Sequence, residues 1–98
     1  ETEPTPITSY LIEFYGRECP HCVRMMPVVA EVEAELGVTF SKLEVWHNSG
    51  NSRIFESYAD KIGNACGGVG VPTFFNMRTG RAVCGEVPKS ELLVLIKG

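Results

Sequence analysis

The chain has 98 residues, of which 44% are hydrophobic and 21% charged, and its net charge at neutral pH is −3. This length predicts one small globular domain with a single core. The nine basic residues form no basic run, which argues against binding to nucleic acid or to an anionic membrane. No segment approaches the roughly 20 apolar residues that a membrane-spanning helix needs. Proteins and small molecules are therefore the expected partners.

The N-terminal segment 1–9, which begins ETEPTP, is expected to be a polar tail ahead of a folded domain at residues 10–98. No signal peptide with a basic start and an apolar centre is visible. An export or transit segment could already have been removed. The compartment is therefore left open between the cytoplasm and the lumen or stroma of an organelle.

Two strands are expected in the first half of the chain. Residues 10–15, YLIEFY, form a β-prone apolar run that is interrupted by Glu13 and ended by Gly16. Such a run is typical of a buried central strand. Residues 38–46, VTFSKLEVW, alternate well enough for a second strand.

A helix is predicted between these strands, because apolar side chains recur there at three- and four-residue spacing until Gly37. Pro27 is expected to bend this helix without dividing it. The pattern places Cys22 on the buried face, whereas Cys19 lies at or before the first turn and is expected to be exposed. The expected buried stripe is Cys22, Met26, Val29, Val32 and Leu36.

The second half of the chain predicts one helix, a glycine-rich loop, a β-hairpin and a final helix. Gly80 in the sequence RTGR marks the hairpin turn, and Pro88 opens the last helix. The expected order is β-α-β-α-β-β-α, with a parallel pair joined to an antiparallel hairpin. The helix is expected at 51–65, the loop at 66–71, the hairpin strands in TFFNM and AVCGEV, and the final helix after residue 88. The side chains of that helix expected in the core are Leu92, Leu95 and Ile96.

The segment ECPHC at residues 18–22 has three interpretations: a redox pair, a metal site or a structural disulfide. A structural zinc site normally has four ligands, and the remaining cysteines and histidines show no second paired spacing. A disulfide that closes a two-residue gap would add little stability, because the stabilisation grows with loop length. Redox chemistry is therefore favoured, and neither a metal nor another cofactor is predicted.

The spacing of these cysteines suits thiol–disulfide exchange. Cys19 at a helix N-terminus would be stabilised as a thiolate by the exposed N–H groups and the positive end of the helix dipole. After Cys19 attacks a disulfide, Cys22 one turn later can resolve the mixed disulfide. His21 could hydrogen-bond or add positive potential near Cys19, and Glu18 would act weakly in the opposite sense. Pro20 shapes the helix start without reacting.

In the order of these features the chain resembles the thioredoxin superfamily. CPHC opens a helix directly after a buried strand, Pro27 follows Cys22 by five residues, and GVPT at residues 70–73 precedes the hairpin. The resemblance implies an α/β thioredoxin-like fold in the minimal β-α-β-α-β-β-α form, with a mixed four-stranded sheet flanked by helices. It also implies a thiol-disulfide oxidoreductase acting on protein disulfides.

The resemblance also assigns roles to three further residues. Glu13 stands six residues before Cys19, where thioredoxins carry a buried acidic residue, and would relay a proton to and from Cys22. Pro72 would be a cis proline facing the cysteines, and Val71 with Pro72 would bind substrate polypeptide by strand addition. The chain departs from thioredoxins at Glu18, which replaces the usual tryptophan, and in its Pro-His motif centre, which is similar to that of DsbA-type oxidases.

Other candidates are expected to have ordinary structural roles. Cys66 in the glycine-rich loop could be a resolving or regulatory thiol, but an ordinary cysteine is the favoured interpretation. Cys84 is expected to be a core residue of the hairpin. A Cys66–Cys84 disulfide is not predicted, because the expected hairpin register places Cys84 opposite Phe75. His47 is expected at the surface, and Trp46 in packing.

The leading hypothesis is thus a monomeric oxidoreductase whose partners are disulfide-containing proteins and a reductase or thiol donor. One alternative is a redox-independent module that binds polypeptides in the groove at Pro72. Another is a glutathione-dependent, glutaredoxin-like enzyme, which is weakened by the missing acidic pair of that family. The sequence does not fix the direction of electron flow, because redox poise depends on small differences in thiolate stabilisation.

Overall fold

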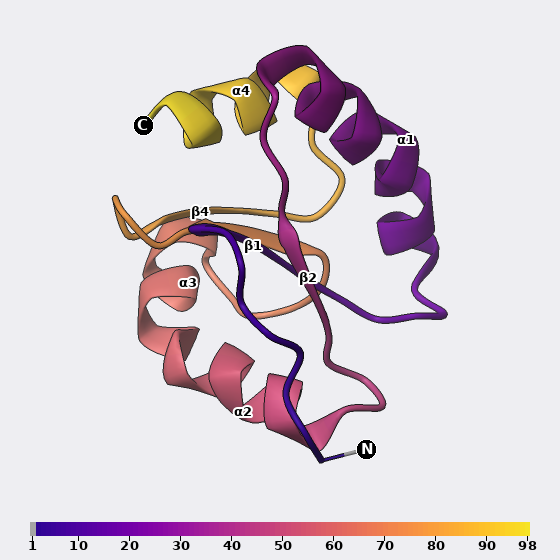
Figure 1. Ribbon diagram of the computed structural model, residues 1–98. Coiled ribbons are helices and arrows are strands. Elements are labelled where there is room, and N and C mark those ends of the chain that lie inside the picture. The colour runs from indigo at the N-terminus through magenta and orange to yellow at the C-terminus, as the bar shows by residue number, and fades with distance from the viewer. Residues whose placement is uncertain (1) are drawn as a thin grey trace.

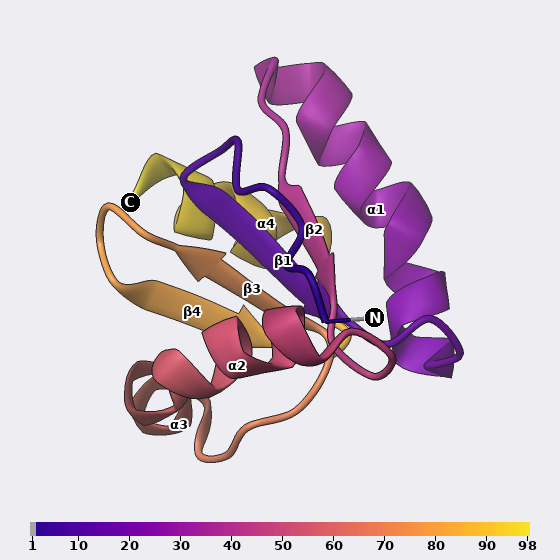
Figure 2. The same ribbon diagram turned by 60° about the horizontal axis from the view of Figure 1, so that its bottom comes forward.

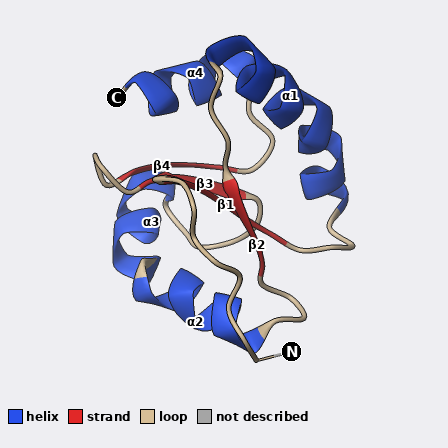
Figure 3. Ribbon diagram, viewed as in Figure 1, coloured by secondary structure: helices blue, strands red, loops and turns tan. Residues whose placement is uncertain are grey.

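The computed structural model describes residues 2–98, and four strands form one sheet that lies between two pairs of helices (Figure 1). Helices α1 and α4 cover one face of the sheet, and α2 and α3 cover the other (Figure 3). The predicted α/β class and mixed four-stranded sheet are confirmed. The elements are β1 (Leu11–Tyr15), α1 (Pro20–Leu36), β2 (Ser41–Glu44), α2 (Ser49–Ser57), α3 (Ala59–Cys66), β3 (Thr73–Asn76), β4 (Arg81–Cys84) and α4 (Lys89–Lys97).

The sheet has the strand order β2-β1-β3-β4. Strand β1 pairs in parallel with β2, across the crossover that contains α1, and antiparallel with β3, which forms the hairpin with β4. Glu13 on β1 is therefore flanked by Lys42 on one side and Phe74 on the other. No helix among residues 2–98 is long and apolar enough to cross a membrane.

Each face of the sheet has its own hydrophobic core. Alternate residues of β1 point to opposite faces, so that Leu11 packs beneath α1 and α4 while Ile12 and Phe14 pack against α2 and α3. On the second face the Phe14 ring stacks on Phe55 with centroids 4.7 Å apart. Because both faces of β1 are covered, this strand is the buried centre of the sheet.

Helix α1 runs unbroken through Pro27, as expected, and ends at Gly37 in the left-handed conformation. The buried stripe differs from the prediction at position 26, and Leu36 is only partly buried against the core. Met25 is buried, whereas Met26 is 63% exposed. Counted from Cys22, position 25 lies on the same helix face as 29 and 32, whereas position 26 has already rotated towards solvent.

The single helix predicted over residues 51–65 is wrong, because the chain forms two helices, α2 and α3, that meet at Tyr58. At the junction the Ser57 hydroxyl donates to the Ile54 carbonyl, and the Tyr58 N–H turns back to Phe55. This tighter turn ends α2 and lets α3 continue along the same face of the sheet. Cys66 consequently lies in the last turn of α3 and not in the glycine-rich loop, which begins at Gly67.

Residues 2–10 have no regular secondary structure and lie beside α2 and β2 (Figure 2), to which hydrogen bonds attach them. The Thr5 N–H donates to the Asn51 side chain at 2.7 Å. The Ser41 hydroxyl oxygen accepts the N–H groups of Thr8 and Ser9. The domain boundary at residue 10 remains a prediction, and the segment preceding it packs on the domain.

Candidate redox site

Cys19 and Cys22 lie at the start of α1, directly after the end of the central strand. The loop between β1 and α1 is closed by a hydrogen bond from the Cys19 N–H to the Gly16 carbonyl at 3.0 Å. Cys19 has the extended backbone of a helix-capping residue, and its carbonyl accepts the N–H of Val23. Pro20 occupies the first helical position, where its missing N–H removes no helical hydrogen bond.

Both cysteines are free thiols, and both are buried, with 4% of Cys19 and 3% of Cys22 exposed. The expected exposure of Cys19 is therefore wrong. The cause lies far away in the sequence, because the Val71 carbonyl oxygen approaches to 3.9 Å from the Cys19 sulfur. Helical periodicity could not reveal that this segment lies against the helix start.

The segment before β3 reaches Cys19 through a cis peptide bond between Val71 and Pro72. Pro72 is buried, and its carbonyl accepts the Gly85 N–H at 2.8 Å, which attaches the segment to the end of β4. Thr73 donates its hydroxyl to the Gly70 carbonyl and so closes the turn in front of the proline. The fold thus brings Val71 and Pro72 to the cysteines from the opposite half of the chain.

Glu13 lies on β1 with 4% of its surface exposed, beside a cavity of about 280 Å³ that is also lined by Cys22. Burial raises the pKa of Glu13 to about 7, Lys42 opposes that shift and Glu33 adds to it. Lys42 is drawn towards Glu33, because its ammonium group lies 2.8 Å from the Glu33 carboxylate. The arrangement leaves Glu13 a carboxyl group that exchanges a proton near neutral pH.

The surroundings of Cys22 oppose its ionisation. Burial raises the pKa of Cys22 to about 12, and neighbouring Cys19 and Glu13 add to the shift. A thiol in that state is a poor nucleophile until a base removes its proton. Glu13 lines the same cavity, so a carboxylate that could accept this proton is close to Cys22.

His21 is exposed, and its Nδ1 lies 2.5 Å from a carboxylate oxygen of Glu86, in the segment between β4 and α4. The same oxygen accepts a hydrogen bond from Arg24 at 2.8 Å. These contacts lower the pKa of Glu86 to about 2, with Arg24 contributing most and His21 second. His21 therefore lies in a cluster with Arg24 and Glu86 and is not an isolated side chain near Cys19.

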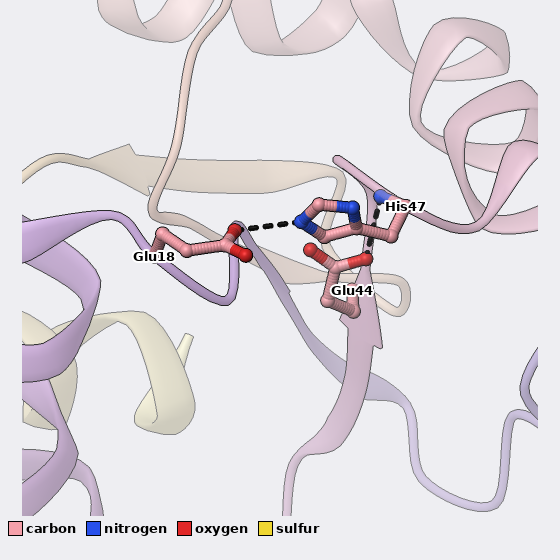
Figure 4. Close-up of side chains that lie close together, drawn as sticks. All are labelled: Glu18, Glu44 and His47. Atoms are coloured by element: carbon pink, nitrogen blue, oxygen red, sulfur yellow. Dashed lines mark hydrogen bonds and ion pairs between the residues drawn. The ribbon is translucent and has the colours of Figure 1, made fainter.

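A second polar cluster consists of Glu18, Glu44 and His47, at the other side of the loop that precedes Cys19 (Figure 4). Their nearest ligand atoms lie within 4.8 Å of one another, a spacing that a metal ion could span. Hydrogen bonds explain this close spacing without an ion. His47 Nε2 lies 2.6 Å from a carboxylate oxygen of Glu18, and Glu44 accepts the N–H groups of Arg17 and His47. The absence of a metal remains a prediction.

These backbone contacts control the ionisation of Glu44. Burial opposes its charged form, but the N–H groups of Arg17 and His47 outweigh burial and hold the pKa of Glu44 below its ordinary value. The carboxylate thereby fixes the loop before Cys19 to the loop after β2. His47 is exposed, as expected, although it is held by Glu18.

Trp46 has a position that the sequence could not reveal. Its ring packs against Gly16, where an added methyl group would lie 2.3 Å from the ring, yet 51% of the residue remains exposed. Gly16 lies three residues before Cys19. The only tryptophan of the chain is thus a partly exposed side chain that packs against the loop before Cys19 and Cys22.

Cys66 and Cys84 form a disulfide with a sequence separation of 18, and the prediction against this bond is wrong. The hairpin register places Cys84 opposite Thr73 and not opposite Phe75. The shift of two residues moves Cys84 towards the end of the hairpin, where the last turn of α3 brings Cys66 beside it. The bond joins α3 to β4 on either side of the segment that carries Pro72.

Comparison with solved structures places this geometry in a known fold. The chain is similar to the thioredoxin NaTrxh from Nicotiana alata, with 25% identity and a TM-score of 0.64 over 89% of this chain and 69% of that one. It is also similar to the glutaredoxin grx-1 from Archaeoglobus fulgidus, with 23% identity and a TM-score of 0.60 over 93% and 89% of the two chains. A thioredoxin from Malassezia sympodialis, Mala s 13, gives 22% identity and a TM-score of 0.62 over 89% and 71%.

No protein-family model matches the chain, and no curated protein matches it by sequence. The similarity to solved thioredoxin and glutaredoxin structures confirms the resemblance to the thioredoxin superfamily. The chain has the thioredoxin-like fold, and its pair of free cysteines makes it similar to the thiol–disulfide oxidoreductases of that superfamily.

Three side chains of the site escaped the sequence analysis. Arg24 carried a readable signal, because it lies one turn after His21 on the same helix face. Glu86 and Glu33 carried no such signal, because their contacts are with partners that only the tertiary fold brings close. The sequence alone offers no spacing from which those contacts follow.

Proposed function

We propose that the protein is a thiol–disulfide oxidoreductase that exchanges electrons between the Cys19–Cys22 dithiol and disulfides of other proteins. The observation that carries the proposal is the free Cys19 thiol at the start of α1, 3.9 Å from the carbonyl that precedes the cis proline. Backbone groups at that carbonyl are suited to pair with an extended substrate chain. Pairing there would present a substrate disulfide to Cys19.

The exchange proceeds in two balanced steps. The Cys19 thiolate attacks one sulfur of a substrate disulfide, forms a mixed disulfide and releases the second substrate sulfur as a thiolate. Cys22 then attacks Cys19, which closes the Cys19–Cys22 disulfide and releases the first substrate sulfur. Two electrons pass from the protein to its substrate, and an external dithiol donor must reduce the protein again.

The second step requires a base, because burial holds the pKa of Cys22 far above neutral pH. We assign this role to Glu13, which is supported by its position in the same cavity and by its pKa of about 7, at which carboxylate and acid coexist at neutral pH. A water molecule in the cavity would carry the proton between them. In the reverse direction Glu13 returns the proton to the departing Cys22 sulfur.

Reduction of insulin disulfides by dithiothreitol tests the proposal. The wild-type protein is expected to accelerate the reaction, and Cys19→Ser is expected to abolish the acceleration. Cys66→Ser combined with Cys84→Ser is the control, because this variant removes two cysteines outside the proposed pair. Full activity of the Cys19→Ser variant would show that another group performs the attack.

A further inference from the structure

The two edges of the sheet differ in what covers them (Figure 2). The edge at β2 is partly covered by the chain itself. The Ser41 hydroxyl accepts the N–H groups of Thr8 and Ser9. The Glu44 carbonyl accepts a hydrogen bond from the Asn51 side chain. Strand β4 forms the opposite edge, and no strand of the described chain pairs with its outer side.

The hydrogen-bond ladder of the hairpin fixes the direction of the β4 backbone groups. The Gly85 N–H donates to the Pro72 carbonyl at 2.8 Å, so these residues form a hydrogen-bonded pair. Such pairs alternate with non-bonded ones along an antiparallel ladder, so the N–H and C=O groups of Ala82 and Cys84 point away from β3. Among residues 2–98, no hydrogen bond from another element reaches these outward groups. They are therefore available to an additional strand.

A groove of about 670 Å³ lies at this edge and is lined by residues of β4, α3 and α4. The two helices cover opposite faces of the sheet (Figure 3). On the α3 side the lining is polar, with Lys61 and Asn64, whereas on the α4 side it includes the apolar Val94 and Leu95. Val94 is 62% exposed. The outer edge of β4 thus faces two walls of different chemistry.

The groove also has an excess of positive charge. Lys61 and Arg81 are exposed, and neither forms an ion pair with another residue of the described chain. Among the described residues that line the groove, Glu91 in the first turn of α4 is the only acidic one. An acidic side chain directed to α3 would be attracted by Lys61, whereas one directed to α4 would be repelled by Glu91. The groove therefore distinguishes the two faces of an added strand.

We propose that the β4 edge binds an extended segment of a partner protein, in which apolar and acidic side chains alternate. This segment adds a fifth strand to the sheet. Successive side chains of a strand point to opposite faces, so that the apolar ones pack on Val94 and Leu95 and the acidic ones face Lys61. The inference does not depend on the proposed redox function, because it uses neither Cys19 nor Cys22.

A single extended segment fits this edge better than a second copy of the chain does. A copy that paired through its own β4 would bring its α3 and α4 to the two faces where α3 and α4 already stand beside the edge. An isolated segment brings no helices. Its backbone hydrogen bonds supply affinity, and its alternating side chains supply selectivity.

The probe is a short fluorescent peptide without cysteine that alternates valine and glutamate, and its binding is followed by anisotropy up to about 1 mM. Saturable binding is expected. A control peptide that alternates valine and lysine should bind at least tenfold more weakly. Hydrogen exchange measured by NMR is expected to show added protection of the Ala82 and Cys84 amides. No saturable binding, or protection at Val71 in place of these two amides, would overturn the proposal.

Two variants test the backbone and the charge separately. Ala82→Pro removes an outward N–H that does not pair with β3, so it should weaken binding at least tenfold while the hairpin is retained. Lys61→Glu is expected to weaken binding about fivefold. Arg53→Glu on α2 is its exposed, charge-matched control and should stay within twofold of the wild type. Binding that survives Ala82→Pro, or equal losses in Lys61→Glu and Arg53→Glu, would contradict the proposed site.

Thermal unfolding verifies that each variant folds. If Ala82→Pro does not fold, the comparison of Lys61→Glu with Arg53→Glu and the exchange data still decide the outcome. Sedimentation without peptide tests the second copy, because a dimer that Ala82→Pro dissociates would assign the edge to self-association and overturn the proposal. Cys19→Ser should bind the peptide as the wild type does, which separates this result from that of the insulin assay.

Discussion

The two cysteine pairs of this small domain differ in bonding and in their place in the fold. Cys19 and Cys22 are three positions apart, remain free thiols and lie where a strand ends and a helix begins. Cys66 and Cys84 are 18 positions apart, are joined to each other and connect α3 to β4. The short separation suits reversible exchange, and the long one suits a structural bond.

The difference follows from loop entropy and from local electrostatics. A disulfide across 18 residues restricts the unfolded chain strongly, and the loop-entropy model assigns it about 3 kcal/mol. A disulfide across the CPHC motif restricts the chain little, so that its formation and cleavage cost the fold little. The CPHC pair has an ionisable carboxyl group, a cavity and a helix N-terminus beside it. We infer that the second pair stabilises the platform on which the first pair works.

The largest expected effect comes from removing the resolving thiol. Cys22→Ser leaves Cys19 able to attack but unable to release its partner, so that mixed disulfides with substrate should accumulate and turnover should fall to the background rate. Non-reducing gel electrophoresis followed by peptide mapping would locate the bond. A trapped bond at Cys66 or Cys84 would contradict the division of roles between the two pairs.

Removing the structural pair should reduce stability and leave the chemistry intact. Cys66→Ser combined with Cys84→Ser is expected to lower the free energy of unfolding by about 3 kcal/mol. The matched control is Cys19→Ser combined with Cys22→Ser. This variant should change the free energy of unfolding by less than about 1 kcal/mol, because Cys19 and Cys22 are not bonded to each other in the folded state. Urea unfolding of both double variants measures the difference, and equal losses would contradict the division of roles.

Glu13 should make the stability depend on pH. Its pKa is raised from 4.5 to about 7 in the folded state, so the folded protein binds more protons than the unfolded chain between these values. The stability that Glu13 contributes is therefore fully present below about pH 4.5 and is lost as the pH rises through 7. Glu13→Gln should remove this loss, with a gain over the wild type of up to roughly 3 kcal/mol at pH 8.5 and none at pH 4.

The same variant separates stability from function. Glu13→Gln should slow the resolving step at least tenfold at pH 7.5 if the carboxylate removes the Cys22 proton. Lys42→Met is a useful companion, because loss of a nearby cation should raise the Glu13 pKa further. A Glu13→Gln variant with wild-type turnover and a wild-type pH profile of stability would exclude both roles.

The smallest expected effect is optical. Trp46 packs on Gly16, three residues before Cys19, and its fluorescence should change modestly when Cys19 and Cys22 are oxidised. Reduction of the Cys66–Cys84 bond should leave it nearly unchanged. Both contributions are measured by titrating the Trp46 emission against a glutathione redox buffer. The titration is then repeated with the variant Cys66→Ser combined with Cys84→Ser.

Most of the fold could be predicted because the local signals agree with the tertiary structure. The apolar run at β1, the helical spacing after Cys22 and the turn at Gly80 each indicate the element that forms. The predictions failed where tertiary contacts decide. The turn at Tyr58 divides one expected helix, and a two-residue difference in hairpin register determines whether Cys84 meets Cys66.

The candidate site shows the same division. Cys19, Cys22 and Glu13 could be recognised from spacing and resemblance, since they lie within one strand–helix unit. The burial of Cys19 by Val71 could not, because that contact joins residues 52 positions apart. The convergence of Arg24 with Glu86 is equally non-local.

A single-turnover experiment tests the central assignment most directly. Protein with free Cys19 and Cys22 and an intact Cys66–Cys84 bond is mixed with excess disulfide-containing polypeptide, quenched in acid and mapped by mass spectrometry. The redox assignment predicts one new Cys19–Cys22 disulfide for each substrate disulfide reduced, with the Cys66–Cys84 bond unchanged. Substrate reduction that leaves Cys19 and Cys22 as thiols would contradict it.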